Sequence, residues 1–332
     1  MKYKKTIGVI VIVAAASGVP LVLNPERSYI VFFLFMAFTY IALAQGWNLA
    51  SGYTGQISLG QHAFVGLGAY MTGFAWLGGL GGYFHPLNIF LSGCCPAILA
   101  VLIGTLLLSR LRGDYFALGT LGLGEILREI FVQGGSLTGG PVGLFLPSGA
   151  YTSMIPYYYY GLLLALFSTA LTYFMVKSQL GLALVAIRED ETAASANGVN
   201  VLKYKVIAFA AGAFISGLCG NLQAYYLFHI NPQNLFGINW ALYPILMCVL
   251  GGSGTITGPI IGSVSLTVLF EFSKVWLPEI HPVFTGALII AVILFLPNGL
   301  VRMKTKRAPI GKGGLMATIS QILNPKLQKG GF

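Results

Sequence analysis

The chain has 332 residues, of which 56% are apolar and only 8% are charged, and its formal net charge is +10. Soluble proteins have about 25% charged residues, so this composition excludes a soluble globular domain and indicates a polytopic helical membrane protein. The basic residues cluster in short loops at regular intervals, which is typical of the positive-inside rule and argues against nucleic-acid binding.

Apolar runs predict ten membrane spans in an all-α fold, since roughly 20 apolar residues cross the hydrocarbon core. Gly251-Gly252-Ser253-Gly254 separates the eighth span from the ninth, and both of these spans are short. The spans lie at about 6–23, 28–46, 57–78, 88–109, 114–132, 157–176, 205–228, 240–251, 256–273 and 283–297.

The first span has two interpretations. Basic residues at 2–5, an apolar run and three alanines at 14–16 resemble a signal peptide that is cleaved near residue 16. The apolar stretch continues to Leu23, which is long for a signal peptide, so we favour a retained helix.

The basic clusters orient the bundle. If the N-terminal lysines lie inside, ten crossings place the other basic clusters inside as well, and both termini are cytoplasmic. The outer loops then keep only Arg27 and Lys274. The inner clusters are Lys2, Lys4 and Lys5, then Arg110 and Arg112, then residues 177–205, then residues 302–307.

The segment 48–70 combines glycines with polar side chains. Its glycines leave one side of the third span open for close backbone contact. Gln56, Gln61 and His62 need hydrogen-bond partners or water at this depth. Two interpretations stay open: these side chains line a polar path, or they are satisfied groups that pack the helices together.

The fifth span carries Glu125, Arg128 and Glu129. Counted from Asp114 at 1.5 Å per residue, Glu125 lies roughly 16 Å into the membrane. Charges at this depth face the bundle interior or a water-filled cavity. Glu125 and Arg128 are three residues apart and can pair, either along a translocation path or as a lock between helices. We favour the lock, because a zwitterionic solute does not require fixed charges.

Residues 133–156 form the longest outer loop, which is rich in Gly, Pro and Ser. Residues 1–307 are predicted to form the transmembrane domain, and residues 308–332 a mobile cytoplasmic tail.

A polar inner loop at 181–200 follows the sixth span. Its four ionisable residues, 188–191, stay out of lipid because each charge there costs several kcal/mol. A stripe along one helix face is predicted beside them, with Arg188 and Glu191 paired at its edge. We interpret this helix as a docking surface for another protein rather than as a solvated loop. The stripe consists of Ile187, Glu191, Ala194 and Gly198.

Patterns for catalysis and metal binding are missing from the sequence. The four cysteines lie in apolar spans without partners at metal-ligand spacing, and the four histidines are scattered. The glycine-rich turn at 251–258 lacks the ending of a phosphate loop. We therefore expect no metal site, no cofactor and no enzymatic activity.

The polar loop also carries a family resemblance. Glu191-x-Ala193-Ala194-x3-Gly198 resembles the EAA motif of bacterial ABC importer permeases, the part that sits on the cytoplasmic ATPase. Over residues 40–302 the chain resembles the branched-chain amino acid permease family, M-type subunit. The matching motifs are Gly52-Tyr-Thr-Gly-Gln-Ile-Ser-Leu-Gly, Arg112-Gly-Asp-Tyr-Phe-Ala-Leu, Glu125-Ile-Leu-Arg, Thr138-Gly-Gly-Pro-Val-Gly-Leu, Ala186-Ile-Arg-Glu-Asp-Glu, Gly251-Gly-Ser-Gly-Thr, Gly258-Pro and Leu296-Pro-Asn-Gly-Leu.

This resemblance implies a type II ABC importer permease in the bacterial inner membrane, surrounded by membrane lipid. It implies a second permease subunit (a related H-type paralogue), two cytoplasmic ATPases and a soluble substrate-binding protein. The ATPase-docking residues are then Arg188, Glu189, Asp190, Glu191, Ala193, Ala194 and Gly198. The candidates for the translocation path are Gln56, Gln61, His62, Glu125 and Arg128.

The substrate stays open at this stage. The family carries leucine, isoleucine and valine, while relatives carry urea, short amides or other amino acids. An ion-coupled secondary transporter is the rival, and it would need a mid-membrane carboxylate, for which Glu125 is the only candidate. Spans two to five and seven to ten start in opposite directions, which favours two inverted repeats.

Overall fold

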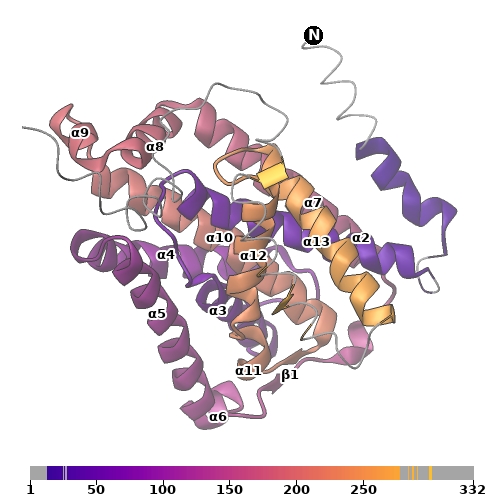
Figure 1. The fold of residues 1–332 in the computed structure, drawn as a ribbon. Helices are drawn as coiled ribbons and strands as arrows, with labels where there is room; N and C mark the ends of the chain where they lie inside the picture. Colours follow the sequence, from indigo (N-terminus) through magenta and orange to yellow (C-terminus); the bar gives the residue numbers. More distant parts are fainter. Residues whose placement is uncertain are drawn as a thin grey trace, which may run out of the picture.

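The computed structural model describes residues 13–24, 26, 28–276 and positions 283, 286, 287, 290, 299 and 300. This part of the chain is a bundle of long helices with one two-stranded ladder (Figure 1). The elements are α2 (Tyr29–Trp47), the π-helical turn η1 (Asn48–Gly52), α3 (Gln61–Leu77), α4 (Pro86–Arg110), α5 (Asp114–Gln133), α6 (Gly135–Thr138), β1 (Leu144–Phe145), the 3-10 turn η2 (Ser148–Ala150), α7 (Ile155–Lys177), α8 (Gln179–Glu189), α9 (Glu191–Ala196), α10 (Val201–Leu227), β2 (His229–Ile230), α11 (Pro232–Leu235), α12 (Asn239–Gly251) and α13 (Thr257–Trp276).

Within the described residues, a long helix occupies each of the second to ninth predicted spans. Each helix begins and ends within four residues of the predicted position. Among them, α2 with η1, α4, α7, α10 and α11 with α12 are long and apolar enough to cross a membrane. Of the first predicted span the structure describes a helix at Val13–Val22. Most of the last span and the whole predicted tail lie outside the described residues, so the total of ten stays a prediction.

Local sequence sets several helix ends. Pro86 occupies the first turn of α4, where its missing N–H is not needed, and His85 Nδ1 accepts the N–H of Leu87. Gly113, with φ of 53°, makes the short turn from α4 into α5. Asn200 caps α10 by accepting the N–H of Lys203.

The connections gather at two opposite ends of the bundle (Figure 1). At the sheet end, which carries β1, β2, α6 and α11, Leu144 pairs with Ile230 in an antiparallel ladder. At the α8–α9 end, Asn48 Nδ2 donates to the carbonyl oxygen of Thr255 at 2.9 Å. Both contacts join loops that the charge pattern assigns to the same side of the membrane, so the folded chain separates its loops in agreement with that pattern.

The leading helix of each predicted repeat packs against the other repeat. α10 packs on α3 and α4, while α2 packs on α12 and α13. α2 finishes at the α8–α9 end, whereas α10 begins there. Two interlocked inverted repeats would have this arrangement. Most of the predicted fourth helix of the second repeat lies outside the described residues.

Glycines permit the closest helix crossings. A Cβ at Gly68 of α3 would overlap the backbone of Gly217 in α10, and one at Gly212 would lie 2.6 Å from the carbonyl oxygen of Gly46 in α2. The predicted close backbone contact along the third span is therefore confirmed. In lipid, where no hydrophobic effect draws helices together, such packing is a main source of their association.

Candidate functional site

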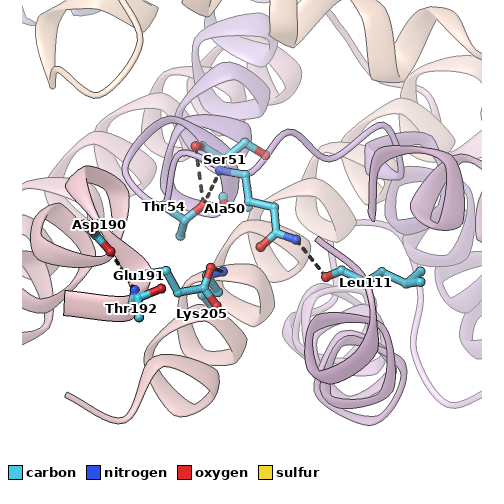
Figure 2. A network of polar contacts seen from close by, with 9 residues as sticks. Ala50, Ser51, Thr54, Leu111, Asp190, Glu191, Thr192 and Lys205 are labelled. Atoms are coloured by element: carbon cyan, nitrogen blue, oxygen red, sulfur yellow. Dashed lines mark hydrogen bonds and ion pairs between the residues drawn. The ribbon is translucent and has the colours of Figure 1, made fainter. Parts of the chain in front are cut away.

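The predicted docking segment is two helices rather than one. Asp190, between α8 and α9, has extended backbone angles (φ −157°, ψ 110°). Its carboxylate accepts the N–H of Thr192 at 2.8 Å (Figure 2) and the N–H of Ala193 at 2.9 Å, and so caps α9. The prediction of one continuous face from Ile187 to Gly198 is therefore wrong, because an N-cap residue leaves the helical conformation and α9 takes a new direction.

Gly198 terminates α9. Its φ is +83°, and the N–H groups of Gly198 and Val199 bond to the carbonyl oxygens of Ser195 and Ala194. This is a Schellman motif, in which glycine is favoured because it has no Cβ to clash in the left-handed conformation. Gly198 is required by the backbone turn and not by close contact, since a Cβ placed there would meet no other atom within 4 Å.

The other predicted docking residues divide into two groups. Glu191 forms an ion pair with Lys205 of α10 at 2.7 Å (Figure 2), and Lys205 is only 4% exposed. Ala194 is also buried. These contacts hold α9 on the bundle. The sequence predicted Arg188 as the partner of Glu191, but in the structure that partner is Lys205. The outward-facing members are Glu189, Asp190 and Ala193.

A groove lies beside these exposed residues, between α8 and the first turn of α10. Its volume is about 500 Å³. Leu182, 73% exposed, and Ala186 form its apolar wall, while Asn200 and Lys203 form a polar wall. The α8–α9 end therefore offers a recess as well as an exposed helix.

Arg188, in the last turn of α8, reaches into the bundle. Its Nη1 donates to the carbonyl oxygen of Gly52 at 2.8 Å, and its guanidinium occupies the space that a side chain at Gly254 would need. Asn48 joins the same two loops, because the N–H of Gly254 donates to its Oδ1 at 2.8 Å. Beside Arg188, burial raises the pKa of the Tyr53 phenol to about 12, so this hydroxyl stays neutral. Arg188 thus contacts the end of α2 and the α12–α13 connection at once.

The polar residues of the third span are deeply buried. Gln61 is 1% and His62 0% exposed, and their side-chain nitrogens and oxygen have no hydrogen-bond partner of normal geometry in the described part of the chain. His62 Nε2 fills the space that a Cβ at Gly124 of α5 would need. Gln56 has one contact, from Nε2 to the carbonyl oxygen of Leu111 at 3.3 Å. Buried polar groups are normally bonded, so packing alone does not explain Gln61 and His62.

Glu125 and Arg128 form the predicted ion pair at 2.7 Å on the open face of α5. Their side chains are 41% and 40% exposed on this subunit. Glu129, one turn from Glu125, is exposed as well and accepts Gln133 Nε2 at 2.5 Å. The pair therefore does not lock α5 to a neighbour within the described residues. It lies on a polar stripe along the outside of the subunit.

One carboxylate was missed by the sequence reasoning. Glu271 of α13 is 8% exposed, accepts the hydroxyl of Tyr29 and pairs with Lys274 at 2.6 Å. Its position inside the predicted span 256–273 was the available signal. Glu271 lies two residues from the end of that predicted span, whereas Glu125 lies in the middle of the fifth span, so Glu125 stays the predicted mid-membrane carboxylate. Both carboxylates are in ion pairs.

Comparison with known proteins gives a consistent result. The model of the family described as "Branched-chain amino acid transport system / permease component" matches residues 29–293. The high-affinity branched-chain amino acid transport system permease protein LivM of Salmonella typhimurium is 29% identical over 307 residues, covering 84% of this chain and 71% of that protein. LivM of Escherichia coli K12 is 28% identical, covering 82% and 70%.

A second group of relatives is similar over a shorter stretch. The permease protein LivH of Salmonella typhimurium is 34% identical over 133 residues, which is 40% of this chain and 42% of that protein. No solved structure matches the chain.

Proposed function

Because the chain belongs to the permease-component family of branched-chain amino acid transport systems, we propose that it is the membrane-spanning subunit of an ATP-driven importer of these amino acids. The observation that carries the proposal is the extent of the family match, which includes every described element from α2 to α13. The exposed segment α8–α9 supports the ATP-driven part, because a permease without its own ATPase needs a surface on which to receive one.

The α8–α9 end is proposed to face the cytoplasm. Arg110, Arg112, Lys177 and Lys203 lie at this end in the described chain, and the positive-inside rule assigns such clusters to the cytoplasmic side. With this orientation both termini are proposed to lie inside, and the family of bacterial and archaeal relatives supports a cell membrane, proposed to be a bacterial inner membrane. The sheet end then faces outward and is where a soluble binding protein would deliver the substrate.

One of the two ATPases is proposed to dock on α8 and α9. The exposed Glu189, Asp190 and Ala193 and the adjoining groove supply its contacts. Glu191 and Ala194 would serve the docking indirectly, by holding α9 on α10. Movement of the ATPase would be transmitted through Arg188, because this side chain contacts loops from both predicted repeats.

A second permease subunit is proposed to cover the open face of α5. An ion pair that is about 40% exposed in the middle of a span, such as Glu125–Arg128, is unfavourable against lipid. A protein surface or a water-filled path removes that cost. Since relatives include both LivM and LivH proteins, the partner would be a related H-type chain.

The translocation path would then run along α5 between the two subunits. Glu125 and Arg128 lie on the face of α5 that is open in this subunit, and His62 lies against its backbone at Gly124. A small displacement of α5 from α3 would open Gln61 and His62 to this path, which gives their unpaired polar atoms a role.

Reconstitution tests the proposal. The chain is co-expressed with its partner permease, the ATPases and the binding protein, and leucine uptake into proteoliposomes is measured with and without ATP. Uptake that needs ATP and is competed by isoleucine and valine is the expected result. Uptake that runs on an ion gradient without ATP would contradict it, and competition by urea or short amides alone would replace the substrate class.

A further inference from the structure

A second cavity lies between the middle of α2 and the start of α12, on the sheet-end side. Its volume is about 230 Å³. Three aromatic rings form its walls: Tyr40 meets Tyr243 edge to face with centroids 5.9 Å apart, and Tyr40 and Trp240 are 6.3 Å apart. We call this cavity the aromatic pocket. The rest of its lining is Gln233, Asn234, Gly237 and Asn239.

The polar groups of the aromatic pocket are available for a ligand. Trp240 Nε1 donates to the backbone oxygen of Asn234 at 3.0 Å, which fixes the indole as a wall. The side-chain amides of Gln233, Asn234 and Asn239 are exposed and make no hydrogen bond to the described part of the chain. None of the lining residues is charged.

This lining matches one class of solute. Aromatic faces attract an ammonium group and also bury aliphatic carbon, and amide N–H groups donate to a carboxylate. A free amino acid carries both charged groups but no net charge, in accord with a lining that has no fixed charge. The volume equals roughly eight water molecules at about 30 Å³ each, and it is below the range of about 300–1,000 Å³ for drug-sized ligands.

We propose that the aromatic pocket binds a free α-amino acid with an aliphatic side chain as it enters the translocation path. The ammonium group lies against the rings of Tyr40, Trp240 and Tyr243, and the carboxylate meets the amides of Asn234 and Asn239. This site deepens the proposed function and rests on it. It is separate from the polar residues of α3 and α5 considered above.

The aromatic pocket is connected to those residues through α11. The open side of α11 presents Gln233 and Asn234 to the pocket, while the chain just beyond them packs inward. Phe236 contacts Phe131 of α5 and fills the space that a Cβ at Gly66 of α3 would need. An occupant of the pocket would therefore contact the short helix that separates it from the two path-lining helices.

The first test measures binding to the full chain in lipid nanodiscs by tryptophan fluorescence, with L-leucine as the probe. Trp240 should respond to leucine, so Trp240→Phe should remove the signal, and Trp76→Phe, in a separate aromatic cluster, should keep it. Asn234→Ala with Asn239→Ala should raise the half-saturating concentration at least fivefold. 4-Methylpentanoate, which lacks the ammonium group, and 3-methylbutylamine, which lacks the carboxylate, should each bind at least tenfold more weakly. No saturable change up to about 10 mM leucine, or an unaltered titration in the double variant, overturns the proposal.

The second test separates this site from the proposed function. In proteoliposomes with the complete importer, Tyr243→Leu should raise the KM for leucine at least fivefold, and Tyr243→Phe, which keeps the ring, should restore it. ATP-driven uptake with an unchanged KM in Tyr243→Leu would reject the pocket and leave the importer intact. Absence of ATP-driven leucine uptake in the unmodified complex would instead reject the proposed function, and the pocket with it.

Discussion

Arg188 and Gly52 are joined by a hydrogen bond of 2.8 Å although 136 residues separate them in the sequence. Gly52 ends the π-helical turn that extends α2, and Arg188 belongs to the last turn of α8. The same turn is held to the α12–α13 connection by Asn48. A displacement of α8 therefore reaches the bundle through one side chain, and this relationship leads to the first prediction.

Arg188→Ala should uncouple ATP hydrolysis from transport. A hydrogen bond from a charged donor contributes about 1.5–3 kcal/mol, so we expect leucine uptake by the reconstituted importer to fall at least tenfold. The ATPases should still co-purify, because the exposed Glu189 and Asp190 are unchanged. Arg110→Ala, which removes an exposed cation at the same end but outside the groove, is the matched control. Normal leucine uptake by the importer with Arg188→Ala would show that movement of the ATPase reaches the bundle through other contacts.

Gly124→Ala should displace the His62 ring, because a Cβ at this position overlaps Nε2. Overpacking of this kind costs about 1–3 kcal/mol, and we expect both a lower melting temperature and reduced uptake. Gly122→Ala is the control, since a Cβ there meets nothing within 4 Å and lies one helical half-turn away. His62→Ala combined with Gly124→Ala should recover the melting temperature. If both single glycine variants behave alike, His62 is not packed against α5.

Asp190→Ala should loosen α9 by removing its N-cap, at a cost of about 1 kcal/mol. Hydrogen exchange of the amides of Thr192 and Ala193, which donate to this carboxylate, should quicken. Asp190→Ser keeps a capping oxygen and should preserve protection. Co-purification of the ATPases should weaken more in the alanine variant than in the serine variant, which loses only the exposed carboxylate. Equal binding by both variants would show that docking does not depend on the cap.

Glu191→Gln should destabilise the chain more than Lys205→Met. The ammonium of Lys205 is almost fully buried, and removal of its partner leaves an uncompensated charge, whereas the Glu191 side chain is 31% exposed and can be hydrated. Because of that exposure we expect about 1–3 kcal/mol for Glu191→Gln, below the loss for a fully buried pair. Thermal melts read by a thiol-reactive dye at the buried Cys219 and Cys248 would check the order. The double variant should lose less than the sum of the two single variants, and simple additivity would contradict the pairing.

Local patterns predicted much of the docking segment but not its shape. The position of residues 181–200 outside the spans follows from their charge. The break at Asp190 had a local signal, because aspartate followed by a glutamate and small residues commonly caps a helix. The continuous face was predicted from helical spacing, which assumes that one helix runs through the whole segment. The N-cap at Asp190 shows that this assumption is wrong.

Long-range partners had no such signal. Nothing near Arg188 in the sequence points to Gly52, and nothing near His62 points to Gly124, because these contacts depend on how α8 and α5 pack against the bundle. The exposure of Glu125 and Arg128 likewise depends on which face of α5 its neighbours leave open. The aromatic pocket brings together Tyr40 and Tyr243, which lie some two hundred residues apart.

The sequence by itself determined that this protein spans a membrane, where its described spans begin and end, and which loops share a side. Lipid imposes these features, since it requires apolar runs of fixed length and keeps charges out of the hydrocarbon. Only the tertiary structure decided which polar side chains are satisfied, which remain unpaired and which face outward. These outcomes depend on helix packing between distant segments, and helix packing in lipid is set by close shape complementarity rather than by composition.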